Sequence, residues 1–240
     1  ATQNSLINLL HSSFSLTGQD VLSTSLVAVH RSIHQEFITK FHDLAKRIII
    51  DHPMDYEQEP FMGPLIDQQA VDNYLLYMGM AKREGFEEIM RGKQLSKKYH
   101  GHYVSPAIHL TDNTGKEESH FLTNEINGPV CTFVIYDEIE EAIEMVNSSP
   151  YGLVTSLFTQ NSSIQQKCIN SISCGGINLN IPTTFRHRSL PTMGIKQSGN
   201  YHPGGSGIIK QSVYPLSCLE LNGEHQDSLE PLKRGINNEG

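Results

Sequence analysis

Apolar residues recur at helical spacing in the first fifth of the chain. The opening residues, 1–14, carry an apolar stripe made by Leu6, Leu9, Leu10 and Phe14, so the chain is expected to open inside an amphipathic helix. Residues 25–32, SLVAVHRS, form a continuous apolar run that is typical of a buried strand. Residues 33–49 return to helical spacing, with one face made by Phe37, Ile38, Phe41, Leu44, Ala45 and Ile48.

A Pro/Gly-punctuated loop, EPFMGPLID, separates these elements from a longer helix. Asp67 ends the loop and is placed to cap a helix over residues 68–85. Gly85 can close that helix, because glycine readily adopts the left-handed conformation found at helix ends. Two short strands are predicted next, at residues 87–90 and 104–109.

Strands and helices alternate in the second half. The β-branched and aromatic run at 128–137 predicts a strand. The acidic start of 138–149 favours a helix, since negative side chains stabilise a helix N-terminus. The remaining predictions are a strand at 151–160, a helix at 164–173 capped by Asn161 or Ser162, and a strand at 175–180. The alternation indicates an α/β fold with a largely parallel sheet flanked by helices.

The last apolar segment, 211–221, reads QSVYPLSCLEL. Its Pro215 has no backbone N–H to donate, which favours an edge strand or a bulge over the centre of a sheet. An exposed edge strand near a terminus can pair with another chain. Residues 222–240 are polar with little periodicity and are predicted to form a flexible tail.

Composition narrows the function classes. The formal net charge is −8, which argues against nucleic acid as a partner because backbone phosphates require a basic surface. No apolar run approaches the roughly 20 residues of a membrane helix, and no signal peptide is recognised, so we expect a cytoplasmic protein. Widely spaced cysteines favour reduced thiols over a disulfide framework or a zinc site; they are Cys131, Cys168, Cys174 and Cys218.

Five segments resemble, in order and approximate spacing, motifs of the aldehyde dehydrogenase superfamily: FSLTGQDV (14–21), NEINGPV (124–130), SPYGL (149–153), GGINLN (175–180) and MGIKQSGN (193–200). The resemblance spans residues 5 to about 220. Three shorter marks, EPFMGPLI, SGNYHP and YPLSCLE, resemble the succinylglutamate semialdehyde dehydrogenase branch of arginine catabolism.

The resemblance implies a division of the chain. Enzymes of this family combine a Rossmann-type cofactor domain, a catalytic domain and a strand that pairs between subunits. It implies that residues 1–210 are the catalytic domain and that 211–221 are the oligomerisation strand of a homodimer. No segment resembles the Gly-rich turn, the phosphate-binding lysine segment or the E-x-G-G general-base motif of the cofactor domain, which is therefore expected to be absent. An opening inside a helix agrees with that expectation.

Val21 occupies the position on which the family's chemistry depends. Aldehyde oxidation needs a thiolate that forms a hemithioacetal, a hydride acceptor and a base that activates water. The motif F-x-x-x-G-Q-x-C places the cysteine three residues after its glycine, and this sequence has Val21 there. An isopropyl group cannot ionise or attack a carbonyl, while Ser23 and Thr24 have no identifiable base. The four cysteines fall elsewhere in predicted helices and strands, where thiols usually act as small hydrophobes.

The resemblance also identifies cofactor and substrate positions. Glu125 matches the glutamate that binds the nicotinamide ribose of NAD or NADP in related enzymes, but Asn127 replaces its aromatic neighbour. Glu125 is therefore predicted to be vestigial, with no cofactor bound by this chain alone. The substrate pocket is assigned to Thr17, Thr184 and Phe185, on the turn before Val21 and on the loop after the strand at 175–180.

Two further pairs of side chains could bind a ligand or a metal ion, but each pair also has an explanation that needs no ligand. Arg186 and Arg188 could bind a dicarboxylate such as a succinylated glutamate, or they could form a solvent-facing basic loop. His100 and His102, two residues apart, are a weak metal signal, and two exposed loop histidines are the default interpretation. We assign no metal site from the sequence.

Three functions remain open. The chain is an inactive aldehyde dehydrogenase homologue that folds and dimerises, or one half of a split enzyme whose cofactor domain is supplied by a partner chain. The third is a non-catalytic binding module whose terminal strand docks on a relative.

Overall fold

The computed structural model describes residues 3–54, 59–111 and 119–220. The helices are α1 (Gln3–Phe14), α2 (His34–Ala45), α3 (Gln68–Arg83), α4 (His120–Thr123), α5 (Ile139–Ser148), α6 (Ser162–Ser171) and the 3₁₀ helices η1 (Ser15–Gly18) and η2 (Gly205–Gln211). The strands are β1 (Leu26–His30), β2 (Glu87–Met90), β3 (Gln94–Leu95), β4 (Tyr103–Val104), β5 (Ala107–Thr111), β6 (Val130–Tyr136), β7 (Tyr151–Gly152), β8 (Val154–Leu157), β9 (Gly176–Leu179) and β10 (Ile195–Lys196).

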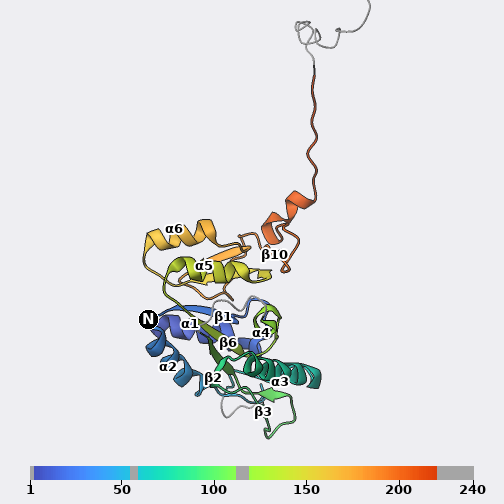
Figure 1. Cartoon of the computed structure of the whole chain (residues 1–240). Coiled ribbons are helices and arrows are strands. Elements are labelled where there is room, and N and C mark those ends of the chain that lie inside the picture. The colour runs from blue at the N-terminus through green and yellow to red at the C-terminus, as the bar shows by residue number, and fades with distance from the viewer. Residues whose placement is uncertain (1–2, 55–58, 112–118, 221–240) are drawn as a thin grey trace, which may run out of the picture.

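A four-stranded sheet organises the first part of the chain, in the order β1-β6-β5-β2 (Figure 1). β1 and β5 both run parallel to β6, with Leu26 opposite Thr132 and Ala107 opposite Val130. Only β2 is antiparallel, against β5. The sheet confirms the predicted α/β fold with largely parallel strands.

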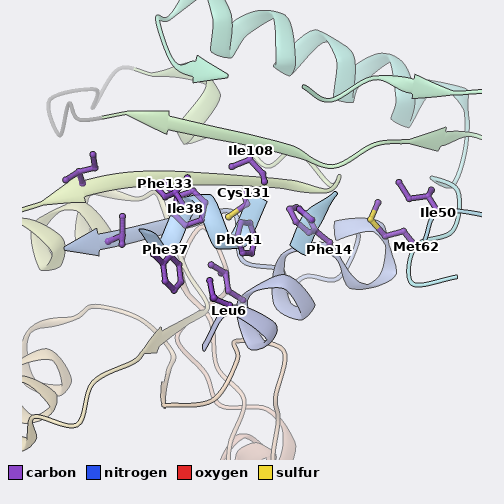
Figure 2. Packing of buried hydrophobic residues seen from close by; sticks show 14 of the residues in the cluster. Leu6, Phe14, Phe37, Ile38, Phe41, Ile50, Met62, Ile108, Cys131 and Phe133 are labelled. Atoms are coloured by element: carbon purple, nitrogen blue, oxygen red, sulfur yellow. The ribbon is translucent and has the colours of Figure 1, made fainter. Parts of the chain in front are cut away.

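Helices cover both faces of this sheet. On one face, α1 and α2 pack against the odd-numbered residues of β6, and the aromatic rings of Phe37 and Phe41 meet Phe133 edge-on (Figure 2). On the other face, α3 and α4 pack against Ala107 and Val130. Burial on both faces explains why β6 is a continuous apolar run without alternation.

The predicted start of α3 is confirmed, while the helix ends at Arg83 rather than at Gly85. Asp67 is extended, and its side chain accepts a hydrogen bond from the Ala70 N–H at 2.8 Å. Gly85 follows the helix with φ +77, a conformation that costs glycine little. Tyr74, fully buried, donates from its hydroxyl to the Ser105 carbonyl at 2.7 Å and fastens the helix to the chain between β4 and β5.

The chain after β6 builds a second layer of strands and helices, seen above the sheet in Figure 1. β8 and β9 pair in parallel, and α5 and α6 accompany them. α5 begins with a capping box between Glu138 and Glu141, and Asn161 caps α6. Two of the family-like motifs meet here, because β7 pairs with β10 and the Gly152 N–H donates to Ser198 Oγ at 3.1 Å.

The strand predicted over residues 104–109 is wrong as a single element. It is interrupted by Ser105 and Pro106, giving β4 and β5, and β5 continues to Thr111. Proline cannot donate a ladder hydrogen bond. Ser105 bonds to Lys93 in two ways: its backbone N–H donates to the Lys93 carbonyl at 2.9 Å, and its Oγ accepts from the Lys93 N–H at 3.1 Å.

The strand predicted over residues 211–221 is absent from the described chain. Residue 211 ends η2, and residues 212–220 pair with no described strand, leaving the body as an extended segment (Figure 1). Tyr214 is 85% exposed and Leu219 fully exposed, as expected for a strand sequence without a partner. Residue 221 and the tail predicted over 222–240 lie outside the described residues. No described helix combines the length and apolar character needed to cross a membrane.

Candidate functional site

The turn after α1 carries Val21, which the resemblance assigns to the nucleophile position. Leu16, Thr17 and Gly18 have φ values of 50, 58 and 69, so three successive residues adopt the left-handed conformation and reverse the chain. Thr17 is buried, and its hydroxyl donates to the Gly63 carbonyl at 3.0 Å. This bond therefore ties the turn to the loop that contains Gly63. Thr17 does not line the cleft that Val21 lines.

Gly18 locks this turn onto the NEINGPV segment. A methyl group on Gly18 would overlap the carbonyl of Gly128 and lie 2.8 Å from the nitrogen of Pro129. A methyl group on Gly128 would in turn lie 2.7 Å from Tyr74 Cδ2. The two motifs are thus in backbone-to-backbone contact, which explains physically why both contain glycine.

Gln19 joins the turn to a third segment, EPFMGPLI. Its side-chain Nε2 donates to the Leu16 carbonyl at 3.1 Å, and its Oε1 accepts from the Ile66 N–H at 3.0 Å. One amide side chain therefore holds both the turn and the neighbouring loop. This is a positioning role that needs no cofactor or substrate.

Val21 points outward from this rigid turn. Asp20 Oδ1 accepts from the Leu22 N–H at 2.9 Å, and the Asp20 carbonyl accepts from the Ser23 N–H at 2.9 Å. Val21 is 65% exposed and lines a cleft of about 1210 Å³, which Glu125 also lines. At the position that the resemblance assigns to the nucleophile, the turn thus presents an exposed hydrocarbon side chain to the cleft.

A threonine pair, which the sequence did not reveal, contributes to the lining of the cleft. Thr24 Oγ1 lies 2.8 Å from Thr183 Oγ1, and Thr183 donates to the Leu22 carbonyl at 2.6 Å. These bonds join the segment after Val21 to the loop after β9, across 159 residues of sequence. No pattern in the sequence marks two ordinary threonines as partners.

The four cysteines lie outside the Val21 turn, and two of them, Cys168 and Cys174, line the same cleft. Burial raises the pKa of Cys131 to about 12 and also raises that of Cys168. Both thiols therefore stay protonated at neutral pH. Cys174 is half-buried and donates from Sγ to the Gly176 carbonyl at 3.0 Å, while Cys218 lies in the exposed C-terminal segment.

The loop predicted to line the substrate pocket lies at the margin of the cleft. Thr184 is half-buried and Phe185 is 56% exposed, and neither lines the cleft. Arg186 Nη2 lies 3.9 Å from Asp20 Oδ1, so its nearest charge partner is a carboxylate of the Val21 turn. Arg188 is exposed.

The histidine pair of the loop before β4 carries no metal-like cluster. The rings of His100 and His102 meet edge-on with centroids 6.2 Å apart. Within residues 3–54, 59–111 and 119–220, no group of three His, Cys, Asp or Glu side chains is arranged to hold a metal ion.

A nicotinamide dinucleotide does not match the described lining of the cleft. Asp20 and Glu125 are its carboxylates, and no lysine or arginine lines it among the described residues. A pyrophosphate would meet two negative charges there without a cation or a Gly-rich turn to offset them. Asn127, with φ 49, stands where the resemblance places an aromatic side chain.

Comparison with known proteins gives the family. The model of the aldehyde dehydrogenase family matches residues 3–214. The chain is 33% identical over 190 residues to an alpha-ketoglutaric semialdehyde dehydrogenase from Bacillus subtilis, covering 78% of this chain and 38% of that protein. It is 30% identical over 199 residues to a 1-pyrroline-5-carboxylate dehydrogenase from Staphylococcus aureus, covering 82% of this chain and 37% of that protein.

Solved structures of aldehyde dehydrogenases are also similar to this chain. A betaine aldehyde dehydrogenase from Staphylococcus aureus, solved in complex with NAD+, superimposes with a TM-score of 0.79 at 25% identity over 87% of this chain and 42% of that one. The lactaldehyde dehydrogenase from Escherichia coli gives 0.78 at 26% identity, with the same coverage. The chain thus spans about two fifths of the length of these relatives. From the motifs, their contacts in space and these matches, it follows that the chain belongs to the aldehyde dehydrogenase family.

Proposed function

We propose that residues 1–240 form a non-catalytic version of the catalytic and oligomerisation portion of an aldehyde dehydrogenase. The observation that carries the proposal is Val21, an exposed hydrocarbon on a turn otherwise built to present a nucleophile. Covalent catalysis on an aldehyde needs a group that can attack the carbonyl carbon. The surrounding glycines and hydrogen bonds maintain the fold whether or not a thiol is present.

Two further observations support the absence of turnover by this chain alone. The cleft has two carboxylates and, among its described lining residues, no lysine or arginine, which opposes binding of NAD or NADP; Asn127 also stands where the resemblance places the aromatic residue that follows Glu125 in the motif. The raised pKa values of Cys131 and Cys168 keep these thiols protonated. We assign the ancestral substrate to the succinylglutamate semialdehyde class. Two relatives whose names specify substrates that carry a carboxylate support this class.

Replacing Val21 by cysteine tests whether position 21 presents its side chain to a reagent, and this test does not depend on catalytic turnover. In a Cys218→Ser background, Val21→Cys is expected to add one thiol that iodoacetamide alkylates in the folded protein, because position 21 is 65% exposed. Mass spectrometry counts the added groups. The Cys218→Ser variant alone, with two buried thiols and the half-buried Cys174, should remain unmodified over the same interval.

The native sequence decides the functional proposal. With NAD+ or NADP+ and a series of aldehydes, including succinylglutamate semialdehyde, purified chain should produce no NAD(P)H above buffer. Absorbance at the nicotinamide band measures this. A rate that saturates with aldehyde would overturn the proposal, whatever the alkylation result.

A split enzyme is the alternative that keeps catalysis. A separately encoded cofactor domain, added in trans, would then restore both cofactor binding and aldehyde oxidation. Val21 opposes this alternative, since the partner would also have to supply the thiolate. We further propose that the protein works in the cytoplasm.

The exposed C-terminal segment favours an oligomeric role. Val213, Tyr214, Leu216 and Leu219 are each at least 68% exposed, which leaves an apolar strand-like segment available to a second copy. We expect a chain ending at residue 221 to be a dimer and a chain ending at residue 211 to be a monomer. Light scattering after gel filtration measures both masses. Equal masses for the two chains would contradict dimerisation through this segment.

A further inference from the structure

β2 forms one edge of the four-stranded sheet (Figure 1). A pocket of about 730 Å³ lies at this edge and is lined by residues 89–94, which run from β2 into β3. α2 and α3, which cover opposite faces of the sheet, also contribute to its lining. No described residue lines both this pocket and the Val21 cleft.

Four basic residues line the pocket, and no aspartate or glutamate lines it among the described residues; the four are His42, Lys46, Arg91 and Lys93. His42 and Lys46 lie four residues apart at the C-terminal end of α2, a spacing that places them on one face of the helix. Arg91 and Lys93 belong to the segment between β2 and β3. Basic residues from two separate elements thus converge on one pocket of a chain whose formal net charge is −8.

The lysines and the arginine of this pocket have no carboxylate partner in the described chain. Lys46, Arg91 and Lys93 are exposed, and none of them forms an ion pair with a described aspartate or glutamate. His42 Nδ1 lies 4.0 Å from Asp43 Oδ1 on its own helix. The C-terminal end of α2 offsets part of the charge of Lys46. Arg91 and Lys93 follow a strand, whose net dipole is small, so their charge remains available to an anion.

The segment that carries Arg91 and Lys93 is held in place by the protein. Ser105 Oγ donates to the Arg91 carbonyl at 3.1 Å and accepts from the Lys93 N–H at 3.1 Å. The Ser105 N–H also donates to the Lys93 carbonyl at 2.9 Å. A methyl group on Gly92 would lie 2.2 Å from Tyr74 Oη, so the backbone here packs directly on that buried side chain. Both basic side chains therefore leave a fixed backbone, which lowers the entropy that binding a ligand would cost.

The β2 edge is protected against pairing with another strand. β2 has four residues, and its register with β5 shifts between Glu88 and Met90, which marks a β-bulge. Short length, a bulge and neighbouring charges all keep edge strands from pairing. The pocket is therefore better suited to a small molecule than to a peptide strand. Its volume also lies within the roughly 300–1,000 Å³ of small-molecule sites.

We propose that this pocket binds a small molecule that carries at least two negative charges on phosphate or carboxylate groups. Arg91 can form two parallel hydrogen bonds with one such group, and Lys46 and Lys93 can approach it as point charges. Leu75 and Met90, which also line the pocket, lower the local dielectric constant and strengthen these attractions. The inference holds whether or not the protein is catalytic.

Calorimetric titration of the full chain tests the proposal, with pyrophosphate as one probe and citrate as the other, at low ionic strength and without divalent cations. At least one of them should bind one molecule per chain with a dissociation constant below about 1 mM. The tighter of the two identifies phosphate or carboxylate as the preferred group. The same probe should shift the backbone amide NMR signals of Gly92 and Lys93. Failure of both probes to bind, or binding that leaves these two amide signals unchanged, would overturn the proposal.

A matched pair of double variants checks the location of the anion. Arg91→Gln with Lys93→Gln removes two positive charges from the pocket. Lys82→Gln with Arg83→Gln removes two charges from the exposed last turn of α3, outside the lining. The first pair should weaken binding of the probe at least tenfold and the second less than twofold, with circular dichroism confirming that both variants are folded. Equal weakening would show that the anion responds only to the overall charge of the chain, and the proposal would then be wrong.

Discussion

Replacing Gly18 by alanine is expected to lower the free energy of unfolding by about 3 kcal/mol, a large part of a typical domain's stability. Two effects add. An alanine held at φ +69 costs about 1 kcal/mol. Its methyl group would also overlap the Gly128 carbonyl, and moving two packed backbone segments apart costs about 2 kcal/mol more.

Gly85→Ala separates these two effects. Gly85 also has a positive φ, +77, but a methyl group there would meet no atom within 4 Å. This variant should lose only about 1 kcal/mol. Urea unfolding followed by circular dichroism measures both. Equal losses for the two variants would show that the Gly18–Gly128 contact does not constrain the turn.

The fold was predictable wherever local sequence and tertiary environment agree. Asp67, Gly85 and the β-branched run of β6 each signal their element by their own chemistry, and the structure confirms them. The prediction of one strand over residues 104–109 was wrong because the hydrogen bonds of Ser105 with residues 91–93 interrupt the ladder. Residues 212–220 pair with no described strand of the single chain, and their predicted pairing with a second copy stays a prediction.

The site was predictable in position but not in its contacts. The resemblance placed Val21 and Glu125, and both line one cleft. It also assigned Thr17, Thr184 and Phe185 to a substrate pocket, whereas Thr17 is bonded to Gly63 and the other two lie outside the lining of the cleft. The Thr24–Thr183 pair was missed, because a contact across 159 residues leaves no local pattern.

His109 lies in β5 with its ring buried against Phe121, centroid to centroid 5.0 Å. Its cross-strand neighbours are Glu88 on β2 and Thr132 on β6. Within the described residues its Nδ1 is buried without a hydrogen-bond partner. Burial therefore lowers the pKa of His109 from 6.5 to about 4, because the apolar surroundings disfavour the charged ring.

Because the pKa of His109 is lower in the folded protein than in the unfolded chain, the free energy of unfolding decreases as the pH falls. The folded protein keeps His109 neutral down to about pH 4, while the unfolded chain binds the proton below about pH 6.5. Protons therefore favour the unfolded state in that window. From pH 7 to pH 4 the contribution falls by about 3 kcal/mol, and above pH 7 it is constant.

His109→Leu should remove this part of the pH dependence. At pH 8 the two proteins differ only by the packing of the substituted side chain, and this difference is the reference. As the pH falls to 4, the native protein should lose about 3 kcal/mol more stability than the variant, since leucine has no proton to bind. Urea unfolding at half-unit pH intervals gives both curves, and all other titrating groups are common to them. Parallel curves would mean that the His109 ring is hydrated or paired in solution, and that burial in β5 does not hold it neutral.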